Sequence, residues 1–261
     1  MRSPTVVVLG SKPGATWPLS HHLYLANRAL TDYPQATEAT ITLHLVGVWK
    51  SVFDALRSYA ASSGKKQPIE SLTVWNNGSL SRTVLKSLEA ADATAFCRSQ
   101  LSEAKIAVNY IQAMNPVERR AMWEDLTGLR EPIADGISSV GFQALWEQRA
   151  PIQKYLRRRL VALPRGRSSR PHAPGIFRPS TGVMALCLAI RNHGDAAKYV
   201  IAGIGLSRRS EYLPPRKSSP SDPGLPRHTY ADKKILSVLS QQFSLTTTEP
   251  ELFSVVPAFV E

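Results

Sequence analysis

A short polar segment, Ser180-Thr181-Gly182, stands directly before an apolar run with helical spacing over 182–192. Serine or threonine at a helix start accepts hydrogen bonds from free backbone N–H groups, so the segment predicts an N-cap. The partial positive charge of a helix N-terminus also favours a bound anion. Two interpretations follow, a structural cap and an anion site, and both can hold together.

His228 is the histidine whose position best suits proton transfer. It ends a stretch over 206–228 that is rich in Pro, Ser and Arg, and a helical pattern containing Asp232 follows it. The stretch is predicted to be a disordered segment or a lid loop. Where a lid returns to a sheet, a histidine can act as a general base near neutral pH, although an ordinary exposed loop histidine fits the pattern too.

Other motifs carry less chemistry. The glycine-rich turn at 10–14, GSKPG, is neither a dinucleotide fingerprint nor a P-loop, and a plain turn and a nucleotide contact are both compatible with it. The six histidines lack metal-ligand spacing and no CxxC, HExxH or DxD occurs, so no metal or other cofactor is expected. The Glu249-Pro250-Glu251 segment is interpreted as a surface turn.

The elements that must position these residues alternate between strand and helix patterns. β-branched or alternating runs predict strands over 5–10, 21–30, 39–49, 71–78, 198–205 and 244–248. Helical patterns separate several of these runs, which predicts βαβ units in a single α/β domain over 1–261, with a Rossmann-like open, mostly parallel sheet. The region 81–163 is predicted to be a helical insertion.

Parallel sheets bind ligands at the carboxyl ends of their strands. This rule singles out the 10–14 turn, Asn27, the WNNG segment at 75–78, the Ser180-Thr181-Gly182 helix start and the segment 203–209. Chemistry is expected at these positions.

The charge is uneven along the chain. Of the +12 net charge on 261 residues, the stretch 151–230 holds essentially all, with 15 basic and 3 acidic residues. Such a stretch suits nucleic acid, an anionic membrane surface or a phosphorylated substrate. No RRM, KH, zinc-finger or OB signature is present, which makes nucleic acid the less favoured partner.

Composition places the chain among globular proteins with a sizeable core, at 43% hydrophobic residues. No apolar run has the roughly 18 residues that cross a bilayer, and no signal peptide is recognised, so a cytoplasmic protein is expected. Cys97 and Cys187 lie in apolar helical patterns and are predicted to be reduced core thiols.

The C-terminal half, RPSTGVMALCLAIRNHGDAAKYVIAGIGLSRRSEYL…RHTYADKKILSVL…FSLTTT, resembles bacterial sialyltransferases of glycosyltransferase family 42. The family has the same order: Arg, small hydroxyls and Gly before an apolar helix, a strand ending in Gly-Ile, a lid with tyrosines, and His before a helix. The N-terminal VVVLGSKPG and YLANRAL segments are similar to the family more loosely, and the helical middle does not align.

The resemblance implies a GT-A-like variant fold and an inverting, metal-independent transfer of an acidic sugar from a CMP-activated donor to a glycan hydroxyl. It makes His228 the base, with Tyr212, Arg208 and Arg209 at the leaving phosphate and Arg178 on the acceptor side. The residues it assigns to the nucleotide and donor are Gly10, Ser11, Lys12, Pro13, Asn27, Ser180, Thr181, Gly182 and Gly203. The implied acceptor is a surface glycan or a lipid-linked glycan, with the enzyme at the periphery of an anionic inner-membrane surface. Family members often form homo-oligomers.

Several positions depart from the family pattern. Ser11 and Gly47 stand where the family has Asn, Ser207 replaces a lid tyrosine, and Gly205 replaces an Asp. These departures leave the donor open between sialic acid, Kdo and another nonulosonic acid. Three alternatives also stay open: a basic nucleic-acid-binding protein, an α/β enzyme of another class, and a transferase-like protein that binds without turnover.

Overall fold

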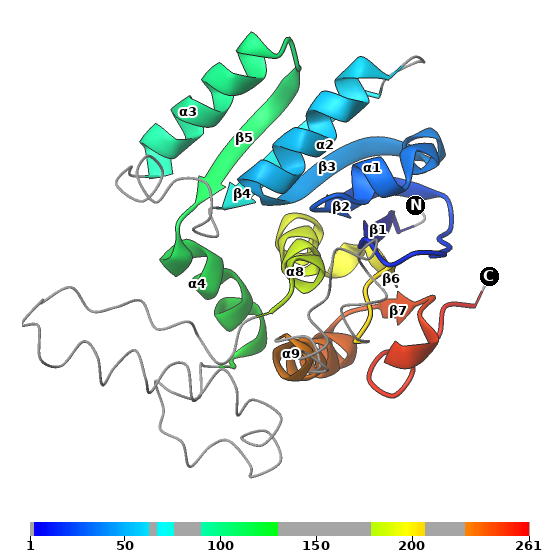
Figure 1. Ribbon diagram of the computed structural model, residues 1–261. Helices are drawn as coiled ribbons and strands as arrows, with labels where there is room; N and C mark the ends of the chain where they lie inside the picture. Colours follow the sequence, from blue (N-terminus) through cyan, green and yellow to red (C-terminus); the bar gives the residue numbers. More distant parts are fainter. Residues whose placement is uncertain (1–2, 63–66, 76–89, 130–178, 207–227, 261) are drawn as a thin grey trace, which may run out of the picture.

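The protein is an α/β fold built on one seven-stranded, all-parallel sheet with the strand order β5-β4-β3-β2-β1-β6-β7 (Figure 1). The computed structural model describes residues 3–62, 67–75, 90–129, 179–206 and 228–260. The strands are β1 (Thr5–Leu9), β2 (Ser20–Ala26), β3 (Thr40–Val48), β4 (Ile69–Trp75), β5 (Val108–Met114), β6 (Lys198–Ala202) and β7 (Leu245–Thr247).

Helices cover both faces of the sheet. The helices α1 (Ala29–Asp32), α2 (Trp49–Ala61) and α3 (Ala90–Glu103) lie on one face, and α4 (Pro116–Thr127), α8 (Thr181–His193) and α9 (Thr229–Gln242) lie on the other (Figure 1). Short 3-10 turns occur at Pro34–Ala39, Gly194–Ala196 and Pro250–Leu252. Two buried apolar clusters, one on each face, form the core.

The topology creates a switch point between β1 and β6. The chain runs outward from β1 through β2, β3 and β4 to β5, and it later returns to place β6 on the opposite side of β1. The central pairing is in register from Thr5↔Lys198 to Leu9↔Ala202. A parallel sheet opens its ligand crevice at such a point, outside the carboxyl ends of the strands.

The central helix α8 is buried along most of its length. Every residue from Gly182 to Ile190 is buried, because the helix lies between the sheet and the neighbouring helices α4 and α9. Ser180 is its N-cap, and the Ser180 Oγ accepts a hydrogen bond from the Val183 N–H at 3.3 Å. The predicted cap and the predicted helix are both confirmed.

Most of the predicted elements are present, but one prediction was wrong. The middle region is not purely helical, since β5 lies between α3 and α4 and forms one edge of the sheet. Its sequence, VNYIQAM, places polar residues three apart, at Asn109 and Gln112, which fits a helical period, and periodicity alone cannot separate a short strand from a helix segment. The remaining residues of the predicted insertion, 81–89 and 130–163, lie outside the described residues, and so do residues 207–227 of the lid predicted over 206–228.

Two further findings bear on the expectations from composition. Cys97 and Cys187 are free and buried, as predicted for core thiols. Within the described ranges, no helix is long and apolar enough to cross a membrane.

Candidate functional site

The loops after β1 and β6 touch at the switch point, and we call this region the carboxyl edge. The Gly10 N–H donates to the Ala202 carbonyl at 2.8 Å, and the Lys12 N–H donates to the Gly203 carbonyl at 3.0 Å. A Cβ atom at Gly10 would lie 2.2 Å from the Gly203 carbonyl oxygen, and Gly203 has φ +63°. Only glycine fits this backbone approach at either position.

The start of α8 meets the same two loops through Ile204. A Cβ atom at Gly182 would lie 2.7 Å from the Ile204 side chain, and one at Gly10 would lie 2.9 Å from it. Ile204 itself is 5% exposed. The fold therefore brings together three glycines predicted to hold the nucleotide, Gly10, Gly182 and Gly203.

Asp232 anchors the start of α8 to the first turn of α9. Its Oδ1 accepts a hydrogen bond from the Ser180 N–H at 2.7 Å, and the residue is 2% exposed. Burial raises the pKa of Asp232 to about 7, although hydrogen bonds from the backbone and hydroxyl of Ser180 act in the opposite direction. A carboxyl group that titrates near neutral pH can donate or accept a proton.

His228 lies one helical turn before Asp232. It is the N-cap residue of α9, and its carbonyl accepts a hydrogen bond from the Asp232 N–H at 2.8 Å. The side chain of His228 is half-buried. Because Asp232 contacts Ser180, the predicted base and the predicted helix start lie at the same edge of the sheet.

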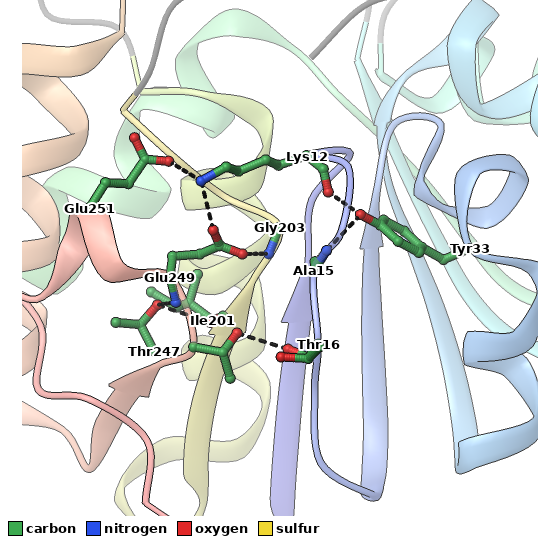
Figure 2. A network of polar contacts seen from close by, with 10 residues as sticks. Lys12, Ala15, Thr16, Tyr33, Ile201, Gly203, Thr247, Glu249 and Glu251 are labelled. Atoms are coloured by element: carbon green, nitrogen blue, oxygen red, sulfur yellow. Dashed lines mark hydrogen bonds and ion pairs between the residues drawn. The ribbon is translucent and has the colours of Figure 1, made fainter. Parts of the chain in front are cut away.

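Lys12 is held by two glutamates that follow β7 (Figure 2). Its Nζ lies 2.9 Å from Glu249 Oε2 and 2.6 Å from Glu251 Oε1. The Gly203 N–H donates to the other Glu249 oxygen at 2.6 Å. Partial burial alone would lower the pKa of Lys12, but its hydrogen bonds to both carboxylates and their charges raise it above the ordinary value. The ammonium group is therefore protonated, and the two carboxylates beside it neutralise its charge.

Glu249 corrects a prediction. It lies in a turn, as expected, but it is 5% exposed rather than on the surface. Its backbone N–H donates to Thr247 Oγ1 at 3.1 Å, and that hydroxyl donates to the Ile201 carbonyl at 3.0 Å. The Thr247 bond ties the end of β7 to β6, and the ion pair of Glu249 with Lys12 ties it to the β1 loop.

Tyr33 fixes the remainder of the β1 loop. Its hydroxyl donates to the Lys12 carbonyl and accepts from the Ala15 N–H at 3.2 Å (Figure 2). The ring of Trp17 packs edge-on against the Tyr33 ring, with the two ring centroids 5.2 Å apart. Ser11 Oγ donates to the Ala26 carbonyl at 3.4 Å. The loop is thus held on both sides.

Asn27 lies beside the carboxyl edge and joins β2 to β3. It adopts a left-handed conformation with φ 53°, and its Oδ1 accepts from the Val48 N–H at 3.2 Å. A Cβ atom at Gly47 would lie 2.6 Å from this oxygen. Glycine at position 47 therefore leaves the space that the Asn27 side chain occupies.

The structure groups most of the predicted residues that it describes. Those at the carboxyl edge are Gly10, Ser11, Lys12, Ser180, Thr181, Gly182, Gly203 and His228. Pro13 is exposed in the β1 loop. The predicted Arg178, Arg208, Arg209 and Tyr212 lie outside the described residues.

Sequence reasoning missed Asp232 and Glu249 as parts of the site. Glu249 comes two residues after β7, so the same strand-end rule that selected the other loops could have selected it. For Asp232 the signal was weaker, because an acidic residue in the first turn of a predicted helix is already explained by its favourable interaction with the helix dipole.

A hollow of about 300 Å³ lies near this edge, between the β1 loop and the C-terminal segment. Its lining residues are Thr16, Trp17, Pro18, Thr247, Thr248, Phe253 and Phe259. None of the predicted site residues lines it, so it is not assigned to the nucleotide.

A second group of side chains that could bind a ligand lies where the end of α8 packs on β2 and β3. His22, His44 and His193 come together so that one ligand nitrogen from each lies within 4.8 Å of the others. We call these three residues the histidine cluster. Their separation along the chain explains why no metal-ligand spacing was visible in the sequence.

Comparison with known proteins gives no further guide. A scan against protein-family models, a search of curated proteins and a search of solved structures each returned no match to this chain. Function is therefore inferred from the site.

Proposed function

We propose that the protein is an inverting glycosyltransferase that moves an acidic sugar from a CMP-activated donor to a hydroxyl of a glycan acceptor. One observation carries the proposal: the N-terminus of α8 meets the Gly10 and Gly203 loops at the switch point of a parallel sheet. The resemblance of the same segments to family 42 sialyltransferases supports the choice of donor.

The start of α8 offers hydrogen-bond donors to the donor's phosphate or sugar carboxylate. The first N–H groups of a helix have no partner inside the helix. Asp232 accepts from Ser180, and Ser180 Oγ accepts from Val183. No described residue accepts from the Thr181 and Gly182 N–H groups, so these two donors are assigned to the ligand.

This chemistry suits transfer without a metal ion. A nucleoside monophosphate leaving group carries less charge than a diphosphate, and fixed backbone donors at a helix N-terminus can stabilise it. Arg208, Arg209 and Tyr212 would add further contacts to the phosphate, and Arg178 would face the acceptor, as the resemblance implies.

Lys12 receives a different role from the one expected from the sequence. Its charge is neutralised by Glu249 and Glu251, and these carboxylates would repel a phosphate beside them. We therefore assign Lys12 to holding the β1 loop against β7, with the nucleotide on the α8 side of the edge.

His228 is assigned as the general base, and Asp232 as a positioning residue. A base must reach the acceptor hydroxyl, and the half-buried His228 is better placed for this than the fully buried Asp232. Asp232 instead fixes Ser180, and with it the first turn of α8. The donor sugar would be sialic acid, Kdo or another nonulosonic acid, and the acceptor a surface or lipid-linked glycan at an anionic membrane.

The first test is a thermal-shift titration with CMP against UMP, GMP and AMP. A ligand that binds only the folded state stabilises it by about 2.7 kcal/mol at a hundredfold excess over its Kd. A CMP-selective rise in Tm is expected. No shift, or an equal shift with every nucleotide, would contradict the proposal.

Two substitutions at residue 181 test the role of the helix start. Proline is tolerated at the first helical position, and the extended backbone of Ser180 (φ −67°, ψ 164°) suits a following proline. Thr181→Pro therefore removes the N–H and the hydroxyl without breaking α8, whereas Thr181→Ala removes the hydroxyl alone. We expect CMP binding to weaken about tenfold more in Thr181→Pro. Equal CMP binding by the two variants would show that the Thr181 N–H group does not contact the ligand.

The base assignment is tested by turnover. His228→Ala should abolish transfer from a CMP-linked acidic sugar while CMP binding persists, and His21→Ala, at an exposed position in β2, should transfer normally. Transfer at the wild-type rate by His228→Ala would rule out this residue as the base.

A further inference from the structure

The histidine cluster joins two strands and a helix on one face of the sheet. β2 and β3 are adjacent, and Tyr24 pairs with His44, so His22 and His44 lie on the same face two residues apart in register. His193 is the last residue of α8, which packs against both strands. The thirteen-residue helix, at about 1.5 Å per residue, places the cluster roughly 18 Å from the Ser180 end.

The spacing of the imidazole nitrogens matches a tetrahedral metal centre. His22 Nδ1 lies 3.4 Å from His44 Nε2. Two ligands bound at about 2.0–2.1 Å in tetrahedral geometry would be roughly 3.3 Å apart. The His193 ring completes a compact group, with its centroid 4.2 Å from that of His22.

Neighbouring side chains hold two of the rings in place. Ser71 Oγ lies 2.7 Å from His44 Nδ1, which turns the Nε2 of that ring toward His22. The Tyr24 hydroxyl lies 3.1 Å from His193 Nε2 and accepts from Asn192 Nδ2 at 3.0 Å. Metal-bound histidines commonly have such a partner on the second ring nitrogen, because it fixes the orientation of the ring.

The end of α8 also favours a cation at the cluster. A neutral imidazole ring offers one nitrogen lone pair to a metal ion. His193 stands at the C-terminus of α8, where the helix dipole attracts positive charge.

We propose that His22, His44 and His193 bind a divalent transition metal ion of the zinc type, with three imidazole ligands and a fourth position open to water. Imidazole nitrogen suits zinc, copper and nickel, whereas calcium and magnesium require oxygen ligands. His44 is buried, and His22 and His193 are half-buried, so the fourth position faces the accessible side of the cluster. The bound ion ties β2 and β3 to the end of α8.

The site is separate from the proposed transfer reaction. It lies at the opposite end of α8 from Ser180, and it needs no donor sugar or acceptor. Binding of the ion should stabilise the folded chain, because the three ligands come from residues far apart in the sequence and would not be preorganised in the unfolded chain.

The test uses the full chain, stripped of metal with EDTA and desalted. Zn²⁺ is titrated by calorimetry, and Co²⁺ by visible absorption, which reports four-coordinate geometry. We expect one equivalent of either ion to bind, the intense visible bands of tetrahedral Co²⁺, and a higher Tm with Zn²⁺. Absence of Zn²⁺ binding, or Co²⁺ bands typical of six-coordinate aqueous ion only, would overturn the proposal.

Variants identify the ligands. His193→Gln and His22→Asn, both at half-buried positions, should weaken Zn²⁺ binding at least about 100-fold, with circular dichroism as the check on folding. The matched control is His21→Ala, since His21 is the neighbour of His22 but is exposed, and its Nδ1 accepts from the Thr5 N–H. Undiminished binding in both ligand variants, or an equal loss in His21→Ala, would place the metal elsewhere and contradict the assignment.

Discussion

The two ends of α8 differ in the polar groups that surround them and in the sign of charge that the helix dipole favours there. At the N-terminus, Ser180 meets the carboxyl group of Asp232, and nearby Lys12 is locked to two glutamates. At the C-terminus, His193 joins two other imidazoles that are neutral near pH 7. The helix dipole favours anions at the first end and cations at the second. One buried helix can therefore serve a proposed anionic donor and a proposed metal ion without either site disturbing the other.

The largest effect is expected where the carboxyl edge is closed by backbone contact. Gly10→Ala places a Cβ atom 2.2 Å from a backbone oxygen, so the β1 and β6 loops must separate. We expect a loss of more than about 3 kcal/mol in the free energy of unfolding, measured by urea denaturation. Gly14→Ala, in the same loop with open space around it and φ +76°, should cost about 1 kcal/mol. Equal losses would show that the two loops can separate without strain.

The two ends of α8 should also give opposite pH dependence in metal-free protein. The pKa of Asp232 is raised from 3.8 to about 7 by burial, so between these pH values the folded state binds more protons and stability falls as the pH rises. The contribution is on the order of 4 kcal/mol. The pKa values of His44 and His193 are lowered from 6.5 by burial, so between about pH 4 and 6.5 the unfolded state binds more protons and stability rises with pH.

Urea denaturation across about pH 4 to 7, with EDTA present, separates these contributions. Asp232→Asn should remove the falling contribution and leave stability that rises more steeply with pH than in the wild type. His193→Gln should remove part of the rising contribution. A pH profile unchanged by Asp232→Asn would show that this carboxyl group does not titrate near neutral pH in the folded chain.

A smaller effect is expected at the ion pairs of the carboxyl edge. Lys12→Met leaves the buried Glu249 carboxylate without its main countercharge, and we expect a loss of about 2 kcal/mol. The control is Lys50→Met, because Lys50 and Asp54 form an i,i+4 pair that is 56% exposed on both sides. That pair should contribute less than about 0.5 kcal/mol. The measurement is again urea denaturation, and equal losses would mean that the edge network adds little stability.

The smallest effect is expected beside the histidine cluster. Tyr24→Phe removes the hydroxyl that contacts Asn192 and His193, at an expected cost of about 1 kcal/mol to the metal-free protein. It should also weaken Zn²⁺ binding about tenfold by releasing the His193 ring. Tyr110→Phe, at a tyrosine that is 57% exposed, should change neither quantity. Normal Zn²⁺ affinity in Tyr24→Phe would show that the ring is held by packing alone.

Local patterns predicted most of the fold. The strands β1, β3, β4 and β6 and the cap of α8 follow from β-branched runs and from one serine before an apolar helix. These features depend on hydrogen bonds and side-chain periodicity among residues close together in the sequence, so a local window of sequence is enough to predict them. The edge strand β5 escaped because VNYIQAM has no β-branched run and places its two polar residues three apart, as a helix would.

The candidate site was predicted only in part, because local patterns do not show which distant segments will be in contact. Strand-end reasoning selected Gly10, Gly203 and Ser180, because the carboxyl ends of parallel strands meet at one edge. It could not show that Lys12 would be neutralised by Glu249, since that contact depends on β7 lying beside β6 and β6 beside β1.

The sequence by itself determined the α/β class, the helix cap and the set of strand-end loops, because each rests on interactions between neighbouring residues. Only the tertiary structure decided that Asp232 would be buried against Ser180, and that His22, His44 and His193 would share one small space. Those contacts join residues far apart in the chain. They depend on strand order, register and the direction of one buried helix, which no local pattern specifies.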